Sequence, residues 1–308
     1  MSAQPLVLVT NDDGIAATGL VSAARAVRAA GARPLVVAPD RDQSGSAMAL
    51  GEFAGVWVRA DEVDWSGHGL AGVPVYQAPA YPATLVTLVA NGALGSRPDM
   101  VLAGVNHGAN TGIGVVHSAT VGAALTAGLA GIPALAVSVG RQSKEVRWTL
   151  CEQVVAAVVA ALALEPVPPG GALNVNLPAA PPTDPAGVAW RPLATFGTSI
   201  GRLERRTEPG GATAVRMVFD QTTRELDADG DSGALLRGEV TLTWLALPHA
   251  PRPDAGWRGR LLERIRDRWP RGGSPAAEIA TGHRLVGSQP RHIPESLQEQ
   301  PEHAVRSP

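Results

Sequence analysis

Short apolar runs recur along the first half of the sequence, and each is closed by a polar, glycine-containing loop. The first run lies at 5–10 and is followed by the loop 11–14 and by helical spacing at 20–30. The same order recurs, with apolar runs at 34–38, 99–103 and 132–139 and helical patterns at 81–94, 118–129 and 143–164. Apolar strands that alternate with helices are typical of a parallel sheet covered on both faces. The sequence therefore predicts an α/β fold with a parallel-sheet core.

The polar loops of such a fold are expected to meet. In open α/β sheets, ligands bind beyond the carboxyl ends of the strands. Polar residues follow three of the predicted strands, at 11–14, 40–45 and 104–114. We therefore expect these three loops to lie at one edge of the sheet and to form the candidate functional site.

The pattern changes after a proline-rich stretch at 166–192. Strand-like segments are found at 173–177, 188–193, 214–219 and 239–247, and no helical pattern separates the last two. This predicts a β-rich extension with a β-hairpin arm used in subunit contact. From Pro270 onward the chain has six prolines and few core-forming residues, which indicates a disordered tail. We therefore divide the chain into a main domain at 1–247 (core at about 1–178, extension at about 179–247), a C-terminal helix at 248–269 and a tail at 270–308.

Composition excludes several kinds of partner. The 308 residues carry 26 Lys and Arg against 28 Asp and Glu, so no nucleic-acid polymer and no membrane is expected as a partner. No apolar stretch reaches the ~20 residues that span a bilayer, and the longest, at 154–164, is expected to be a buried helix. The one cysteine, Cys151, excludes an intrachain disulfide framework and is expected to pack inertly. Because no basic segment lies at Met1 either, we expect a cytoplasmic protein.

Two adjacent carboxylates, Asp12 and Asp13, directly follow the first predicted strand. They repel one another unless a cation or strong donors compensate them, although an isolated Asn-Asp-Asp-Gly sequence is also typical of an Asx turn. Ser44 and Asn106 supply further oxygen atoms from loops expected at the same edge. Carboxylate, hydroxyl and amide oxygens suit Mg²⁺ or Mn²⁺ rather than zinc. We therefore predict one divalent metal ion per subunit, which would leave the site near neutral and able to accept a phosphate.

Ser118 and Thr120 open the predicted helix at 118–129 and follow a glycine-rich loop. Their hydroxyls would lie beside free backbone N–H groups, so this segment is either a plain helix cap or a phosphate-binding site. Two histidines flank the loop, His107 and His117, and each is either a general acid for the leaving alcohol or a structural residue.

Other candidate motifs are weaker. The aspartates at 227, 229 and 231 alternate as in a calcium loop, but no bidentate Glu follows, so a polar turn is expected. A phosphate-binding P-loop is excluded because the single lysine is Lys144, and no Gly-x-Gly-x-x-Gly follows a strand. The segment 136–140, with Ser138 at its centre, lacks the first glycine of a hydrolase nucleophile elbow. A serine hydrolase therefore remains only a weak alternative.

Four motifs resemble, in order and spacing, the SurE survival-protein family of metal-dependent nucleotidases. They are VTNDDGI at 9–15, VAPDRDQSG at 37–45, PDMVLAGVNHGAN at 98–110 and SATVGAA at 118–124. The resemblance covers about 5–247 and implies a Rossmann-like core with a β-hairpin arm, a dimer or tetramer, and hydrolysis of nucleoside 5′- and 3′-monophosphates. It implies metal ligation by Asp12, Asp13, Ser44 and Asn106, and a phosphate near Asn110, Ser118 and Thr120. Within that site we expect Asp12, Asp13 and His107 to act in catalysis.

The sequence departs from the family pattern in two loops. The family has two acids where this chain has Ile113 and Gly114, and Tyr-Ser-Gly-Thr where it has residues 117–120. The segment 77–82 also differs. Because the predicted metal ligands are kept, these changes favour a different leaving group, so a phosphatase of a non-nucleotide metabolite is one alternative. A catalytically silent binding or assembly protein is another.

Overall fold

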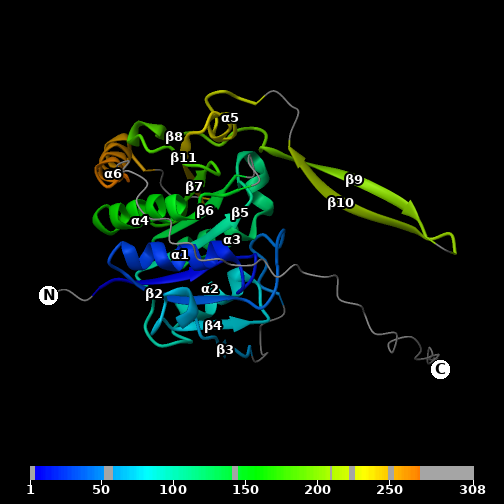
Figure 1. Cartoon of the computed structure of the whole chain (residues 1–308), viewed down its shortest axis with the longest axis horizontal. Coiled ribbons are helices and arrows are strands. Elements are labelled where there is room, and N and C mark those ends of the chain that lie inside the picture. The colour runs from blue at the N-terminus through cyan, green and yellow to red at the C-terminus, as the bar shows by residue number, and fades with distance from the viewer. Residues whose placement is uncertain are drawn as a thin grey trace. The chain divides into compact units, whose positions relative to one another are not determined.

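A nine-stranded sheet forms the body of the computed structural model, which describes residues 4–51, 58–140, 145–208, 210–221, 226–248 and 253–270 (Figure 1). The strand order is β3-β4-β2-β1-β5-β6-β7-β11-β8. These strands are β1 (Leu6–Thr10), β2 (Arg33–Pro39), β3 (Asp61–Glu62), β4 (Val75–Ala78), β5 (Met100–His107), β6 (Ala134–Val139), β7 (Gly171–Leu177), β8 (Val188–Trp190) and β11 (Val240–Ala246). The α-helices are α1 (Thr18–Ala29), α2 (Pro82–Ala90), α3 (Ala119–Leu129), α4 (Trp148–Leu164), α5 (Asp231–Leu236) and α6 (Ala255–Asp267). Three short 3-10 helices lie among them in the described chain, η1 (Ser66–His68), η2 (Gly112–His117) and η3 (Pro185–Gly187).

The centre of the sheet is parallel. Strand β1 pairs in parallel with β2 and with β5, and the parallel order continues through β6 to β7. Strands β3 and β11 run antiparallel to β4 and β7. The predicted Rossmann-like α/β core is therefore confirmed, and the sheet is mixed only toward its margins. The carboxyl ends of β1, β2, β5 and β6 consequently lie at the same edge.

Helices cover both faces of the sheet because the buried strands alternate their side chains between two cores. Val7 and Val9 of β1 pack in one core, with apolar residues of α1, α4 and α6. Leu8 packs in the other, with residues of α2 and α3. Successive residues of a strand point to opposite faces, so one apolar run supplies both cores. This arrangement explains why the first half of the sequence reads as continuous apolar runs rather than as alternating ones.

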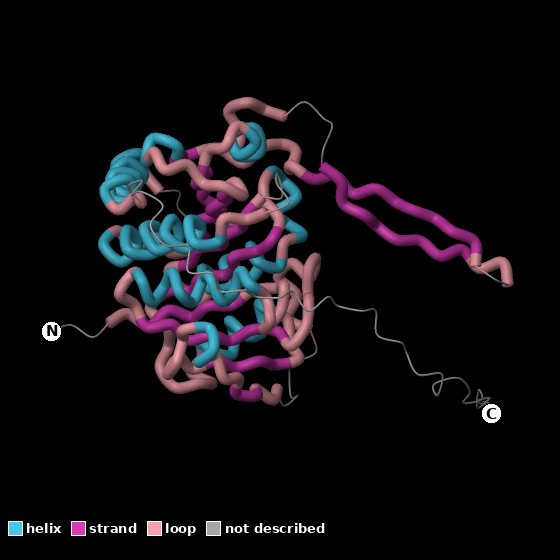
Figure 2. The backbone as a smooth tube through the Cα atoms, viewed as in Figure 1, coloured by secondary structure: helices cyan, strands magenta, loops and turns pink. Residues whose placement is uncertain are grey.

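The hairpin arm consists of strands β9 (Ser199–Thr207) and β10 (Thr213–Gln221), which pair only with each other among the described strands. In Figure 2 the arm lies apart from the main sheet. The arm confirms the expected hairpin, but its first strand was not predicted, because charged residues occupy much of 202–206. The expectation that no helix separates 214–219 from 239–247 is wrong. The helix α5 lies there, and its six residues are too few to give a periodic signal.

The last described elements agree with the sequence. Helix α6 lies within the segment 248–269, where a C-terminal helix is expected. The predicted tail lies outside the described residues except for Pro270. No helix in the described part of the chain is both long enough and apolar enough to cross a membrane.

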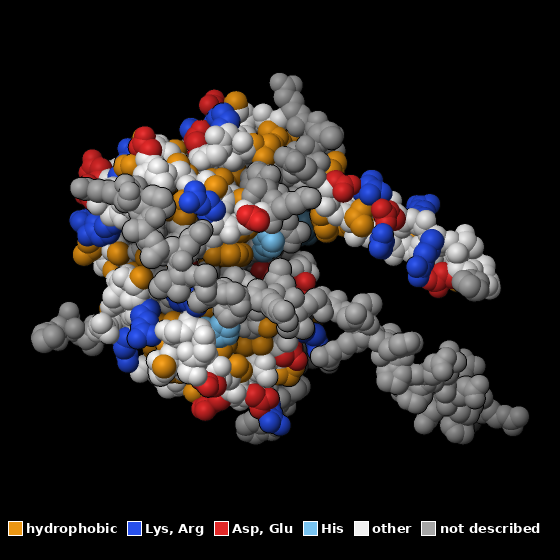
Figure 3. Space-filling model, viewed as in Figure 1, with side chains coloured by type: hydrophobic (Ala, Val, Ile, Leu, Met, Phe, Trp, Pro, Cys, Tyr) orange, Lys and Arg blue, Asp and Glu red, His pale blue; other side chains and the backbone are white. Residues whose placement is uncertain are grey.

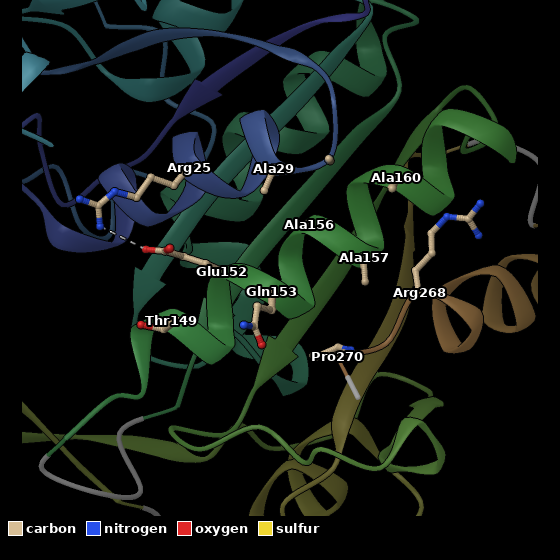
Figure 4. Close-up of a pocket in the computed structure, with 11 residues that line it drawn as sticks. Arg25, Ala29, Thr149, Glu152, Gln153, Ala156, Ala157, Ala160, Arg268 and Pro270 are labelled. Carbon is tan, nitrogen blue, oxygen red and sulfur yellow. Dashed lines mark ion pairs between the residues drawn. The ribbon is translucent and has the colours of Figure 1, made fainter. Parts of the chain in front are cut away.

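A groove of about 680 Å³ lies along the outer side of α1 and α4 (Figure 4). Alanines of both helices line it together with Gln153 and Arg268. Glu152 crosses between the two helices, because it accepts a hydrogen bond from Ser22 at 3.0 Å and pairs with Arg25 at 3.6 Å. These contacts fasten α1 to α4, and the groove runs along the helices rather than over the polar strand ends.

Candidate functional site

Asp12 lies at the point where three chain segments meet. It follows β1 and is 4% exposed. The Thr120 hydroxyl, in the first turn of α3, donates to Asp12 Oδ1 at 2.5 Å. The Gln43 N–H, in the loop after β2, donates to the Asp12 carbonyl oxygen at 2.7 Å. The expected convergence of these loops at one sheet edge is therefore confirmed for Asp12.

Asp13 connects the end of β1 to β5. Its Oδ2 atom accepts a hydrogen bond from the His107 backbone N–H at 3.3 Å. The His107 side chain is exposed, and its ring lies edge-on to the ring of Trp148 with centroids 6.2 Å apart. His117 is exposed at the end of η2. His107 thus lies beside the carboxylate pair, and Trp148 is a neighbour that sequence patterns did not single out.

Burial and like charge both act on the Asp12 carboxylate. Burial raises the pKa of Asp12 to about 6, the hydrogen bond from Thr120 opposes that shift, and the charges of Asp13 and Asp42 add to it. The Oδ1 atom of Asn11 is buried and finds no hydrogen-bond partner among the described residues. A bound cation would relieve the carboxylate repulsion.

Ser44 and Asn106 lie in segments that border this pair. Ser44 is exposed, and its N–H donates to Asp42 Oδ1 at 2.7 Å in the loop that Gln43 attaches to Asp12. Asn106 is half-buried near the end of β5, and its side-chain N–H donates to the Gly108 carbonyl oxygen at 2.6 Å. This bond uses the amide nitrogen and leaves the amide oxygen for a ligand.

The chemistry of these donors fits a hard divalent cation. The four predicted ligands supply two carboxylates, a hydroxyl and an amide oxygen. No group of three or more His, Cys, Asp or Glu side chains placed to hold a metal is found within the described ranges. Such donors are typical ligands of Mg²⁺ or Mn²⁺ rather than of zinc, and the metal stays a prediction.

A row of polar side chains crosses three neighbouring strands beneath the site. In register, Asn106 of β5 lies opposite Ser138 of β6, which lies opposite Asn176 of β7. The row holds Asn110, whose side-chain N–H donates to Ser138 Oγ at 2.8 Å and whose backbone N–H donates to Asn176 Oδ1 at 2.8 Å. Asn174 and Asn176 each donate to the Asn110 carbonyl oxygen, at 2.8 and 2.9 Å.

Ser138 and Asn176 are therefore site-building residues that sequence reasoning missed. Both are fully buried within strands, and the only signal was the polar residues inside largely apolar runs, one in β6 and two in β7. Ser138 lies inside β6 rather than on a strand-to-helix turn, which removes the geometric basis for a serine-hydrolase elbow.

The start of α3 forms the other wall of the site. Ser118 Oγ caps the helix by accepting the Val121 N–H at 3.1 Å, as the capping alternative expected. The Thr120 side chain is fully buried and is directed to Asp12, so its hydroxyl is occupied there rather than beside a phosphate. A Cβ on Gly122 would lie 2.1 Å from the Ala47 carbonyl oxygen, so only glycine lets the 46–48 loop approach this helix.

The surroundings of Cys151 decide its role. Cys151 is buried in α4, and burial raises the pKa of its thiol to about 12, which confirms inert packing.

Of the three alternating aspartates, Asp227 and Asp229 are exposed, as a polar turn requires. Asp231 is not part of such a turn, because it is fully buried and accepts the Gly112 N–H at 3.1 Å. The turn prediction for Asp231 is therefore wrong, since its partner lies 119 residues away.

Comparison with known proteins identifies relatives of this fold and site. Residues 7–198 match the family model described as "Survival protein SurE". The chain is 32% identical over 267 residues to the 5′-nucleotidase SurE of Xanthomonas campestris pv. campestris (strain B100), which covers 83% of this chain and 96% of that protein. The 5′-nucleotidase SurE of Xanthomonas euvesicatoria pv. vesicatoria (strain 85-10) gives the same identity and coverage.

A solved structure agrees with these sequence relatives. The structure titled "Crystal Structure of Sure Protein from Aquifex aeolicus" is similar with a TM-score of 0.65 and 26% identity. The similarity covers 79% of this chain and 93% of that chain. Because the family model and relatives above 30% identity both span most of the sheet and its polar edge, the chain belongs to the SurE survival-protein family.

Proposed function

We propose that the protein is a divalent-metal-dependent phosphomonoesterase that hydrolyses nucleoside 5′- and 3′-monophosphates to nucleoside and phosphate. The observation that carries this proposal is the buried carboxylate of Asp12 beside Asp13, at a strand end that faces the start of α3. Relatives that bear the name 5′-nucleotidase SurE, at 32% identity, support the same reaction class.

The metal ligands in this proposal are Asp12, Asp13, Ser44 and Asn106. Once bound, a divalent ion would supply Lewis-acid stabilisation of the phosphate and a more acidic water. Thr120 fixes the orientation of Asp12 through its hydroxyl, so the carboxylate enters the site preorganised. The polar row beneath the site holds Asn110 in the same way.

The protein groups that bind and protonate the substrate surround these ligands. Ser118 Oγ occupies the Val121 N–H, so the N–H groups of Ala119 and Thr120 at the start of α3, which have no intrahelical partners, would attract the phosphate oxygens beside Ser118 and Asn110. Hydrolysis adds water across the P–O bond, so the leaving oxygen must gain a proton. We assign this proton transfer to His107 or Asp13, which lie together at the rim.

A panel of phosphate esters with Mg²⁺, Mn²⁺ and Co²⁺ tests this function. We expect metal-stimulated release of phosphate, with nucleoside monophosphates as the best substrates, and loss of turnover in Asp12→Asn. Asp99→Asn is the matched control, because Asp99 is an exposed aspartate beside the opposite end of β1. Wild-type turnover in Asp12→Asn would refute the metal role, and no hydrolysis of any ester would favour a binding or assembly protein.

One observation favours a second substrate class. Ile113 and Val116 are apolar and 58% and 68% exposed, in the loop between Asn110 and Ser118. This surface suits a leaving group that is less polar than a ribonucleoside, so a phosphorylated non-nucleotide metabolite is our second candidate. A clear preference for nucleoside monophosphates in the same panel would reject it.

We also propose that the arm mediates self-association into a dimer or tetramer. One face of the hairpin carries Leu203 and Met217, directly paired across the strands, together with Val215 and Phe219, and all four are more than half exposed. The opposite face carries ion pairs, among them Arg202 with Asp220 at 2.9 Å, and charged side chains are visible along the arm in Figure 3. An exposed apolar face on a two-stranded sheet marks a protein contact.

A further inference from the structure

The loop that leads from Asn110 to α3 is attached to both roots of the arm. We call residues 194–198, which precede β9, the first root of the arm. We call residues 230–232, the N-cap and first residues of α5 in the segment that follows β10, the second root. The Gly112 N–H donates to both carboxylate oxygens of Asp231, at 3.1 and 3.2 Å. Asp231 Oδ1 also accepts the Ala194 N–H at 3.0 Å. The Asp231 carboxylate therefore joins the loop to the first root. Asp231 is itself part of the second root.

The attachment is reinforced by direct backbone contact. A Cβ on Gly112 would lie 2.4 Å from the Phe196 carbonyl carbon, so the loop and the first root touch without an intervening side chain. The Thr198 N–H donates to Thr111 Oγ1 at 3.2 Å, and the Ser232 hydroxyl donates to the Phe196 carbonyl oxygen at 2.6 Å. These contacts place the loop, both roots and Asp231 in one hydrogen-bonded cluster.

Asp231 is suited to this role by its environment. It is fully buried, and its carboxylate accepts hydrogen bonds from the backbone N–H groups of Gly112 and Ala194. A buried carboxylate held by several donors fixes their relative positions more tightly than a neutral acceptor does. Gly112 begins η2, and η2 ends at the residue before Ser118, the cap of α3. A displacement at Gly112 is therefore passed on to the residues proposed to contact the phosphate.

We propose that Asp231 is a positioning residue that holds the 110–118 loop in its phosphate-binding conformation and fastens it to the arm. This inference rests on the proposed phosphomonoesterase function and deepens it. The carboxylate itself does not touch the substrate. It acts through Gly112, so its loss weakens phosphate binding while leaving the metal ligands Asp12 and Asp13 in place.

Steady-state kinetics with a generic phosphomonoester and Mn²⁺, together with inhibition by inorganic phosphate, test the proposal. In Asp231→Ala we expect the KM and the phosphate inhibition constant to rise by about tenfold or more, the factor expected for a lost charge-assisted hydrogen bond. In Asp231→Asn, which keeps one acceptor oxygen, we expect a smaller rise in both. Mn²⁺ affinity should be unchanged in both variants. Asp254→Ala is the control, because Asp254 caps α6 away from the loop and its loss should leave both constants unchanged.

The outcomes separate the two proposals. A wild-type protein that hydrolyses no ester would refute the proposed function itself. If the wild type is active, unchanged constants in a folded Asp231→Ala protein would overturn the positioning role alone. A fall in kcat with unchanged KM and unchanged phosphate inhibition would also overturn it. If Asp231→Ala does not fold, Asp231→Asn decides the question. A rise in its KM and its phosphate inhibition constant would support the proposal, and wild-type values of both would reject it.

Discussion

Replacing Asp12 by Asn should stabilise the metal-free protein at neutral pH. Burial raises the pKa of Asp12 from 3.8 to about 6, so the folded protein holds this proton to a higher pH than the unfolded chain does. Raising the pH from about 4 to about 6 therefore lowers the free energy of unfolding. A shift of about two pKa units corresponds to about 3 kcal/mol, which the neutral amide of Asp12→Asn avoids.

The assay is urea unfolding of both proteins in EDTA at pH 7.5 and at pH 5. We expect the variant to be more stable by up to about 3 kcal/mol at pH 7.5, and about half of that advantage to remain at pH 5. Thr120 can still donate to the amide oxygen, so the hydrogen bond is kept. Asp99→Asn, at an exposed position beside the other end of β1, controls for the Asp-to-Asn change itself. Equal stability of Asp12→Asn and wild type at pH 7.5, or a difference that does not shrink at pH 5, would refute the reasoning.

Three other perturbations follow from the contacts. Thr120→Val removes the hydroxyl that orients Asp12 and should lower kcat/KM by about tenfold in saturating Mn²⁺; unchanged kinetics would contradict the orienting role. Gly122→Ala places a Cβ 2.1 Å from a backbone carbonyl oxygen and should lower the free energy of unfolding by at least about 2 kcal/mol in urea titrations. Gly114→Ala meets no atom within 4 Å and is its matched control, so equal losses would argue against the clash. Phe219→Ser should shift the protein to a smaller oligomer in light scattering, and an unchanged mass would count against the arm as the contact.

The sheet and its polar edge could be predicted because they follow from local patterns. Apolar runs closed by polar loops indicate strands, and parallel strands place their carboxyl ends at one edge whatever their separation in sequence. For this reason Asp12 lies close to Thr120, which is 108 residues away in the sequence, and Asp13 lies close to His107, which is 94 residues away. The first strand of the arm escaped prediction because its residues are largely exposed and many are charged, so no apolar alternation marks it.

The supporting residues could not be predicted because their partners are fixed by register and by irregular backbone. Ser138 is the one polar residue of β6 and Asn176 is one of two asparagines in β7, and their role follows only from their alignment with Asn106 across β5, β6 and β7. Asp231 comes from a segment after the arm, where no strand-end rule applies. Gly112, the partner of Asp231, is a glycine and contributes only its backbone N–H, so no side-chain pattern in the sequence indicates this contact.

The 110–118 loop is held at three points of different origin, and this explains how the chain can depart from the family pattern between the last two. Asn110 is fixed from below by Ser138 and Asn176 of the sheet, whereas Gly112 is fixed by Asp231 beside the arm. The helix cap at Ser118 fixes the other end of the loop. Ile113, Gly114 and Val116 lie exposed between Gly112 and Ser118, so these positions can change without moving the groups proposed to bind metal and phosphate. Val115 is buried against residues of α2 and α3 and is the exception. The presence of Ile113 and Gly114 in place of two acids would therefore change the surface that a leaving group meets, while the residues proposed to bind metal and phosphate stay where the sheet places them.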